Sequence, residues 1–250
     1  MIENNPLDYD IVVTGGLSGI GLETIKSIKN NSPKSKIIIT SKEYDSGCER
    51  LEKLFPGDHN INLLELDLEN DQSVDHFLKK VNKICKKVYA LVLNAGFIET
   101  SPCLMTTQDA MEKHLKINYT NNIKIVQFIV RKYMLKQRVG SIINISSSAA
   151  KFANGGRMAY AASKSAMSLA IKVMSRELAK NNITFNSISP GLTDTKLMRN
   201  STNEDKIRDY LDIVDNKRVG MPSEIASLIN FLVFNNTHIT GQDISVDGGI

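Results

Sequence analysis

Short apolar runs alternate with longer, more polar stretches along the whole of this 250-residue chain. The runs are rich in β-branched residues and have the length of buried strands, whereas several of the stretches between them repeat their apolar positions at helical spacing. The runs lie at residues 10–14, 36–40, 61–66, 89–93, 141–145, 183–188 and 243–246. Strands and helices that alternate without a linker are typical of a parallel sheet with helices on both faces. The fold class predicted is therefore α/β, a doubly wound parallel sheet of about seven strands with helices on both faces, in a single domain over residues 1–250.

The helical pattern is clearest at residues 72–87, where Val74, Phe77, Leu78 and Val81 share the inner side of an amphipathic helix. Further helices are expected after residue 19 and at residues 107–137, 158–180 and within 218–234. Pro190 and Gly191 are expected to stop the sixth strand. Residues 192–216 are polar and irregular in pattern, which is typical of a mobile lid.

The first strand runs directly into the glycine-rich turn GGLSGIG at residues 15–21. Strand, glycine turn and helix in this order form the context of a dinucleotide-binding site. Gly15 and Gly19 allow a sharp turn and a close approach to a pyrophosphate, Gly21 allows close packing of helix and strand, and the helix N-terminus faces the anion. Taken alone, an ordinary strand-to-helix turn is an equally good interpretation.

The residues after the next strands indicate which dinucleotide is bound. Ser41 stands where an acidic residue would hold the ribose 2′-hydroxyl of NAD, and Lys42 could pair with a 2′-phosphate. NADP is therefore the predicted cofactor, with NAD possible; the alternative is that Lys42 merely opens a surface helix. Asp67 follows the third strand, where it could meet the adenine. The small residues Ala95 and Gly96 follow the fourth strand and allow a close approach of the cofactor.

Candidate chemistry lies in residues 147–164. Tyr160 and Lys164 are four residues apart, so on a helix they share one face. A neighbouring ammonium favours the phenolate and should lower the tyrosine pKa from its usual value of about 10, which suits proton donation to a carbonyl oxygen. Ser147 lies thirteen residues before Tyr160, at the end of a strand, where its hydroxyl could bond the same oxygen. Alone, this pair of residues does not establish a catalytic site.

Charge and composition narrow the function classes. The chain has 31 basic and 27 acidic residues, a net charge of +4, and its charges are spread out, which disfavours a nucleic-acid partner but would suit an acidic substrate or partner. Its three cysteines contain no CxxC pair and its four histidines are scattered, so neither a disulfide framework nor a metal site is predicted. The N-terminal ten residues are polar, and no apolar run reaches the length of a membrane span. We expect a cytoplasmic protein without a membrane segment.

Taken together, the motifs resemble the short-chain dehydrogenase/reductase family from Thr14 to Gly249. They are TGGLSGIG (14–21), Asp67, NAG (94–96), Asn118, Ser147, YAASK (160–164), SPGLTDT (189–195) and VDGG (246–249). Two positions depart from the family pattern: Leu93 replaces an asparagine, and Ser18 stands where many NADP-dependent members have a basic residue.

The resemblance implies roles for these residues. Tyr160 would exchange a proton with the substrate oxygen, Ser147 would polarise the carbonyl, and Lys164 would bind the nicotinamide ribose and lower the tyrosine pKa. Asn118 would hold a water that links Lys164 to solvent, and Thr193 and Thr195 would meet the nicotinamide carboxamide. The cofactor-binding residues implied are Gly15, Leu17, Ser18, Gly19, Ile20, Gly21, Ser41, Lys42, Asp67, Leu68, Asn94, Ala95, Gly96, Tyr160, Lys164, Pro190, Gly191, Thr193 and Thr195. A serine-histidine triad is not expected, because no histidine follows at a plausible place.

Within the family the chain looks most like 3-oxoacyl-[acyl-carrier-protein] reductases, on residues 154–156, 218–226 and 239–249. Such enzymes dock an acidic carrier protein on basic residues; Arg138 matches one such position, but Asn181 stands at the other. The substrate is therefore either a 3-oxoacyl thioester or another small-molecule carbonyl, such as a sugar or a specialised metabolite. A non-catalytic dinucleotide-binding module is a third interpretation. The family also implies a homodimer or homotetramer built on the two long helices.

Overall fold

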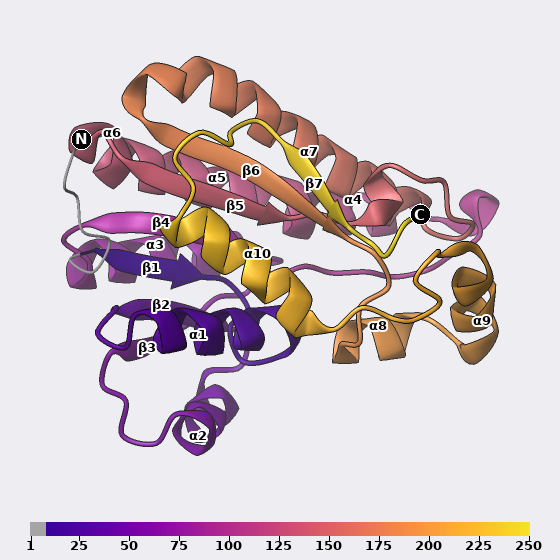
Figure 1. The fold of residues 1–250 in the computed structure, drawn as a ribbon, viewed down its shortest axis with the longest axis horizontal. Coiled ribbons are helices and arrows are strands. Elements are labelled where there is room, and N and C mark those ends of the chain that lie inside the picture. Colours follow the sequence, from indigo (N-terminus) through magenta and orange to yellow (C-terminus); the bar gives the residue numbers. More distant parts are fainter. Residues whose placement is uncertain (1–8) are drawn as a thin grey trace.

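Seven parallel strands form one sheet in the computed structural model, which describes residues 9–250. The strand order is β3-β2-β1-β4-β5-β6-β7, so the chain starts inside the sheet, runs to one edge and then crosses to the other (Figure 1). The strands are β1 Asp10–Val13, β2 Ile37–Ser41, β3 Ile61–Glu65, β4 Val88–Leu93, β5 Gly140–Ile145, β6 Ile183–Pro190 and β7 Asp243–Val246. The order reverses between β1 and β4, and ligands of such sheets bind outside the carboxyl ends of the strands at that point. The predicted fold class is confirmed.

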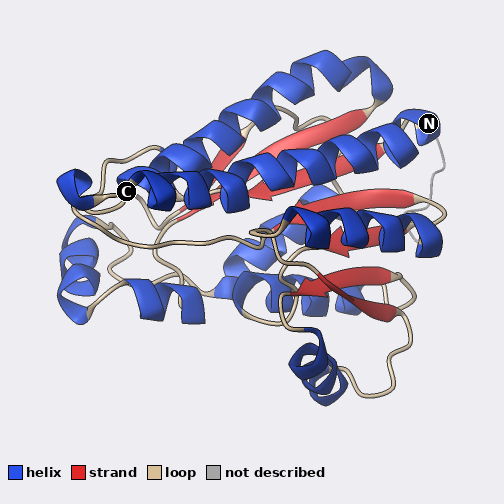
Figure 2. Ribbon diagram, turned by 180° about the vertical axis from the view of Figure 1, so that it is seen from behind, coloured by secondary structure: helices blue, strands red, loops and turns tan. Residues whose placement is uncertain are grey.

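Helices cover both faces of the sheet. Ile25 and Ile28 of α1 and Ile225 and Ile229 of α10 belong to one apolar core, which lies in front in Figure 1. The opposite face, seen in Figure 2, is covered by α3, α5 and α7 and encloses a second apolar core. The helices are α1 Gly19–Asn31, α2 Tyr44–Leu54, α3 Asp71–Ile84, α4 Gln108–Leu115, α5 Asn121–Ile129, α6 Leu135–Gln137, α7 Met158–Leu178, α8 Lys196–Ser201, α9 Glu204–Ile213 and α10 Pro222–Phe234.

The long helix predicted at residues 107–137 is interrupted by two wider turns. Helices α4, α5 and α6 are joined by π-helical segments at Lys116–Thr120 and Val130–Met134. A π turn inserts one extra residue and is frequent at functional sites. The first of these segments contains the buried side chain of Asn118.

Several predicted boundaries are wrong. The segment at residues 192–216 is not irregular, because it forms α8 and α9, whose first turns are capped by the side chains of Thr195 and Asn203. Strand β6 runs beyond residue 188 but ends at Pro190, which pairs with Val246 of β7, so the predicted stop at Pro190 and Gly191 is confirmed. A strand end tolerates proline, which has no N–H to donate. Helix α3 ends at Ile84 rather than at residue 87, and the helix α2 was not predicted.

Two predictions concern membranes and export. Among residues 9–250, no helix is long and apolar enough to cross a membrane. We expect no signal sequence because the N-terminal segment is polar. That segment lies mostly in residues 1–8, outside the described residues.

Candidate active site

The glycine turn after β1 has a backbone that larger residues would not tolerate. Gly15 and Gly19 have φ angles of +69° and +51°, in the left-handed region that favours glycine. A Cβ atom on Gly21 would overlap the carbonyl oxygen of Gly15 and lie 2.6 Å from Nδ2 of Asn94. Gly21 therefore lets the first turn of α1 pack directly against the ends of β1 and β4.

Hydrogen bonds between three strands hold this turn in place. Nδ2 of Asn94 donates to the carbonyl oxygens of Thr14 and Gly15, at 2.9 and 3.0 Å. The Thr14 hydroxyl accepts from the backbone N–H groups of Asn94 and Ala95, both at 3.0 Å. The Thr40 hydroxyl at the end of β2 accepts from the Gly15 N–H at 3.0 Å. Thr14 and Thr40 were not predicted as site residues, although a threonine at a strand end is the visible signal for both.

A cleft of about 560 Å³ opens beside this turn and contains nearly every predicted site residue. It is lined by Gly15, Leu17, Ser18, Gly19, Ile20, Ser41, Lys42, Asp67, Leu68, Asn94, Ala95, Gly96, Ser147, Tyr160, Lys164, Pro190, Gly191, Thr193 and Thr195. Only Gly21 and Asn118 of the predicted set lie outside the lining. The cleft is large enough for a ligand of cofactor size.

Opposite charges pair at the end of the cleft near β2 and β3. Nζ of Lys42 lies 3.0 Å from the Asp67 carboxylate and 3.8 Å from Glu69, and Lys113 lies 3.2 Å from Glu69. The hydrogen bond to Asp67 is the main reason that the pKa of Lys42 is raised. Exposed pairs of this kind contribute about 0–1 kcal/mol, so Lys42 can exchange its partner for another anion at small cost.

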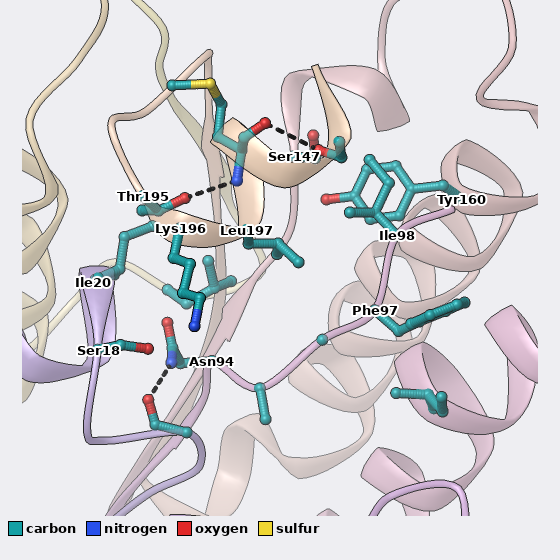
Figure 3. Close-up of a pocket in the computed structure, with 18 of the residues that line it drawn as sticks. Ser18, Ile20, Asn94, Phe97, Ile98, Ser147, Tyr160, Thr195, Lys196 and Leu197 are labelled. Carbon is teal, nitrogen blue, oxygen red and sulfur yellow. Dashed lines mark hydrogen bonds between the residues drawn. The ribbon is translucent and has the colours of Figure 1, made fainter. Parts of the chain in front are cut away.

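Ser147, Tyr160 and Lys164 meet at the other end of the cleft. The Tyr160 hydroxyl points into the cleft beside Ile98, on the side where Ser147 lies (Figure 3). Tyr160 and Lys164 are both buried, and Nζ of Lys164 lies 5.9 Å from the centroid of the tyrosine ring. The Lys164 ammonium donates to the carbonyl oxygen of Ile145 at 2.7 Å.

The electrostatics of this cluster differ from the prediction. Burial raises the pKa of Tyr160, while the Ser147 hydroxyl and the charge of Arg157 act in the opposite direction. Lys164 donates to the Ile145 carbonyl rather than to the phenol, and burial lowers its own pKa to about 8. The net effect on the Tyr160 pKa is set by burial. The expected lowering of the tyrosine pKa by Lys164 is therefore wrong for this structure.

Asn118 lies behind the cleft and connects its parts. Its Nδ2 donates to the Phe97 carbonyl at 2.8 Å and to the Ser163 hydroxyl at 3.0 Å, and its Oδ1 accepts from the Phe97 N–H at 2.9 Å. A Cβ atom on Gly96 would lie 3.2 Å from this Oδ1 and 3.3 Å from Nζ of Lys164. Asn118 therefore ties the loop after β4 to α7 and lies close to Lys164.

The part of the cleft wall that sequence reasoning missed comes mainly from α8 and from the loop after β4. Leu197 and Ile98 flank the space in front of the Tyr160 hydroxyl (Figure 3). The other lining residues that were not predicted include Phe97, Arg157, Lys196, Met198, Ser201 and Thr202. The adjacent apolar residues 197 and 198 were the only feature of the sequence that could have indicated that α8 lines the cleft.

Comparisons with known sequences agree with this architecture. The family model described as "Enoyl-(Acyl carrier protein) reductase" matches residues 15–250. The 3-oxoacyl-[acyl-carrier-protein] reductase FabG of Buchnera aphidicola subsp. Schizaphis graminum is 32% identical over 243 residues, covering 96% of each chain. The reductase MabA of Mycobacterium tuberculosis is 30% identical, over 96% of this chain and 92% of its own length.

Solved structures with the same fold include proteins with either nicotinamide cofactor. The structure described as "ElxO with NADP Bound" is 26% identical, with a TM-score of 0.86 over 96% of this chain and 97% of its own. The structure described as "4-hydroxyisoleucine dehydrogenase complexed with NADH" is also 26% identical, with a TM-score of 0.87 over 96% and 98%.

The doubly wound sheet, the glycine turn and the cleft at the strand ends define an NAD(P)-dependent oxidoreductase of the Rossmann class. The match to the family model and the similarity to the curated relatives then identify the family within this class. The chain belongs to the short-chain dehydrogenase/reductase family.

Proposed function

We propose that this enzyme reduces a ketone to a secondary alcohol with NADPH, and that Tyr160 donates the proton. The observation that carries the proposal is the meeting of Ser147, Tyr160 and Lys164 in the same cleft as the glycine turn. The positive φ angles of Gly15 and Gly19, and the space that a Cβ atom on Gly21 would fill, fit a dinucleotide pyrophosphate at the start of α1. When bound, the nicotinamide supplies the hydride.

The side chains of the cleft supply the proton and the orientation. Because burial raises the pKa of Tyr160, its phenol stays protonated at neutral pH, as a donor to a carbonyl oxygen must be. The Ser147 hydroxyl would bond the same oxygen and fix the direction of the carbonyl. Lys164 would hold the nicotinamide ribose, and Asn118 would help to supply protons through a water, as the resemblance to the family implies.

Mutation of Tyr160 tests this role. Tyr160→Phe keeps the buried ring but removes the only proton that the side chain can give, so kcat should fall by about 10²–10⁴ while cofactor affinity stays the same. NADPH oxidation and NADPH fluorescence titration measure the two quantities. Tyr44→Phe, on α2 outside the cleft lining, is the matched control. Full activity of Tyr160→Phe would contradict the proton-donor role.

The preference for NADP rests on residues 41 and 42. Ser41 has no charge to repel a 2′-phosphate, and the exposed ammonium of Lys42 has only surface carboxylates as partners. ElxO, among the structural relatives, has NADP bound. Lys42→Ala should weaken NADPH binding more than NADH binding, whereas Lys34→Ala should change neither. Equal losses for the two cofactors would count against phosphate recognition by Lys42.

The first candidate substrate is a 3-oxoacyl thioester, because the curated relatives FabG and MabA are 3-oxoacyl-[acyl-carrier-protein] reductases. A carrier protein would dock near Arg138, whose guanidinium donates to the Lys180 carbonyl at 3.3 Å and so lies next to Asn181. The second candidate is another alcohol or ketone, since 4-hydroxyisoleucine dehydrogenase has the same fold over 96% of this chain. NADPH oxidation with acetoacetyl thioesters, compared with sugars and cyclic ketones, separates the two. Cofactor binding without turnover of any carbonyl would favour the non-catalytic alternative.

A homodimer or homotetramer built on the long helices is also part of the proposal. Leu169 and Val173 of α7 are 64% and 47% exposed, which fits a surface that a second copy covers. Light scattering of the purified protein tests this point: a monomer at micromolar concentration would contradict it. The cytoplasmic location stays a prediction.

A further inference from the structure

The catalytic end of the cleft contains an arginine to which no role has yet been given. Arg157 is the N-cap residue of α7, and Tyr160 is the third residue of that helix. N-cap and third-position side chains are neighbours in the first turn of a helix, with Cβ atoms about 5–6 Å apart. Both residues line the cleft.

The charges along the cleft are unevenly distributed. Its only acidic lining residues, Asp67 and Glu69, lie at the end near β2 and β3, where they pair with Lys42 and Lys113. Arg157 forms no ion pair with any carboxylate of residues 9–250. Within residues 9–250, therefore, the charge of Arg157 is not paired with a carboxylate, and Glu99, an acidic residue close by in the fold, lines a separate small pocket with Gly156 and Met158.

The guanidinium of Arg157 has capacity for a ligand. One of its nitrogens, Nη2, donates to the Thr202 hydroxyl at 2.8 Å. A guanidinium carries five N–H donors in a planar fork, so a single bond to a neutral hydroxyl leaves donors for a planar oxyanion. The side chain is partly exposed, so a ligand in the cleft can reach it.

The start of α7 adds to the positive potential. This helix has 21 residues, no acidic residue in its first turn and no side chain that caps its first N–H groups. Its N-terminus therefore carries a partial positive charge next to Arg157. Apolar side chains flank the space in front of the Tyr160 hydroxyl, with Ile98 beside the tyrosine ring and Leu197 across from it (Figure 3). A substrate that fits has a small apolar body and one anionic group near its carbonyl.

We propose that Arg157 binds an oxyanion of the substrate, a carboxylate or a phosphate, and that this selects anionic ketones for reduction at Tyr160. The proposal rests on the ketone reduction proposed above and narrows its substrate class to the second candidate, because a 3-oxoacyl thioester has no oxyanion near its ketone. The close spacing of the two side chains places the oxyanion within a few bonds of the carbonyl carbon.

A structural role of Arg157 is the competing explanation. Its bond to Thr202, at the C-terminal end of α8, could simply hold that helix over the cleft. Thr202→Val removes the hydroxyl but keeps the shape of the side chain, so it breaks this bond and leaves the charge of Arg157 in place. The two explanations therefore predict different results for the two variants.

The test uses pairs of ketones that differ in charge. Acetoacetate is compared with ethyl acetoacetate, and dihydroxyacetone phosphate with dihydroxyacetone, through kcat/KM with saturating NADPH. We expect a higher kcat/KM for the anion in at least one pair. A preference for acetoacetate indicates a carboxylate ligand, and a preference for dihydroxyacetone phosphate indicates a phosphate ligand. Arg157→Gln should lower the ratio of kcat/KM for the anionic ketone to kcat/KM for the neutral one by about 10-fold or more, because hydrogen bonds to a charged group are among the strongest in proteins. Arg157→Lys should restore part of the ratio.

The controls decide between the explanations. Arg176→Gln, at the exposed far end of the same helix, should leave the ratio unchanged, and Thr202→Val should lower it far less than Arg157→Gln. An equal loss in Thr202→Val, or no preference for either anion, would overturn the proposal. Calorimetric titration of the NADP-loaded protein with each anionic ketone adds a readout without turnover, and absence of binding for both would also overturn it. If the neutral ketones are still reduced, ketone reduction itself stands.

Discussion

The two walls of the cleft are built in different ways. The first wall, residues 14–21 with residues 94–96, follows β1 and β4, and every residue of β1 is buried. Its hydrogen bonds join residues about 80 positions apart, as between Thr14 and Asn94. The second wall is formed by residues 192–202 of the α8–α9 segment (residues 192–220), whose two helices contain no buried residue. Its caps at Thr195 and Asn203 are local bonds to the third residue of each helix.

A few bonds connect the α8–α9 segment to the rest of the molecule. Its base is closed by hydrogen bonds between Leu192 and Gly220 and between Asp194 and Gly220, both at 2.9 Å. The Tyr210 hydroxyl of α9 donates to the Asp247 carbonyl at 2.8 Å. Val214 is fully buried and the N–H groups of Asp215 and Asn216 donate to the carbonyl oxygens of Gly249 and Gly248, but the two helices themselves bury no residue. A region with few buried side chains opens locally at lower cost than the core. The comparison indicates that the first wall is the more rigid of the two and that the second can adapt its shape more easily.

The largest effect is expected from a methyl group placed in the first wall. In Gly21→Ala the new Cβ overlaps the Gly15 carbonyl, and neither the turn nor Asn94 can move without breaking the hydrogen bonds between β1 and β4. We expect the free energies of NADPH binding and of unfolding to become less favourable by more than about 3 kcal/mol in total. NADPH titration and urea unfolding measure the two parts. Gly155→Ala, where nothing lies within 4 Å, is the control; equal behaviour of the two variants would mean that the wall is not rigid.

The buried ammonium in the cleft should be visible in the pH dependence of stability. Burial lowers the pKa of Lys164 to about 8 from 10.5. Between these values the unfolded chain binds a proton that the folded protein does not, so the free energy of unfolding rises with pH in this window. Below pH 8 the buried ammonium lowers the free energy of unfolding by about 3 kcal/mol, and this penalty disappears as the pH approaches 10.5.

Lys164→Met isolates this contribution. The free energy of unfolding of the wild type minus that of the variant should increase by about 3 kcal/mol between pH 7 and pH 10.5. Cys85, whose pKa burial raises to about 12, contributes with the opposite sign but equally in both proteins. Urea unfolding across this range checks the prediction, and two parallel curves would show that Lys164 titrates normally.

The smallest effect is expected in the α8–α9 segment. Tyr210→Phe removes the hydrogen bond to Asp247, worth about 1 kcal/mol. Because the segment opens locally, protease cleavage within residues 192–220 should become several-fold faster, and KM for the carbonyl should rise while cofactor affinity is unchanged. Tyr44→Phe on α2 serves as the control. An unchanged rate of protease cleavage in Tyr210→Phe would mean that the second wall is as firmly held as the first.

The difference between the walls also explains which predictions failed. Each buried strand contains a short cluster of apolar residues, many of them β-branched, even where polar residues such as Asn144 and Asn186 are buried beside them, so the strand positions could be predicted to within about two residues. Helix α8 has six residues, too few to show a helical period, and α9 with the residue after it does place Ile207, Tyr210, Leu211 and Val214 at helical spacing, a signal that the prediction of an irregular segment did not use. The π turn around Asn118 was missed because one extra residue hardly changes the pattern of a long helix.

The sequence alone determined the alternation of strands and helices, the glycine turn and the order of the polar residues at the strand ends. These follow from local chemistry: burial demands apolar side chains, and a tight turn demands residues without a Cβ atom. Only the tertiary structure decided the direction of the Lys164 ammonium, which donates to Ile145, and the position of Arg157 between Tyr160 and Thr202. Both depend on atoms from segments far apart in the chain, and spacing along one helix cannot show which of them a long, flexible side chain will contact.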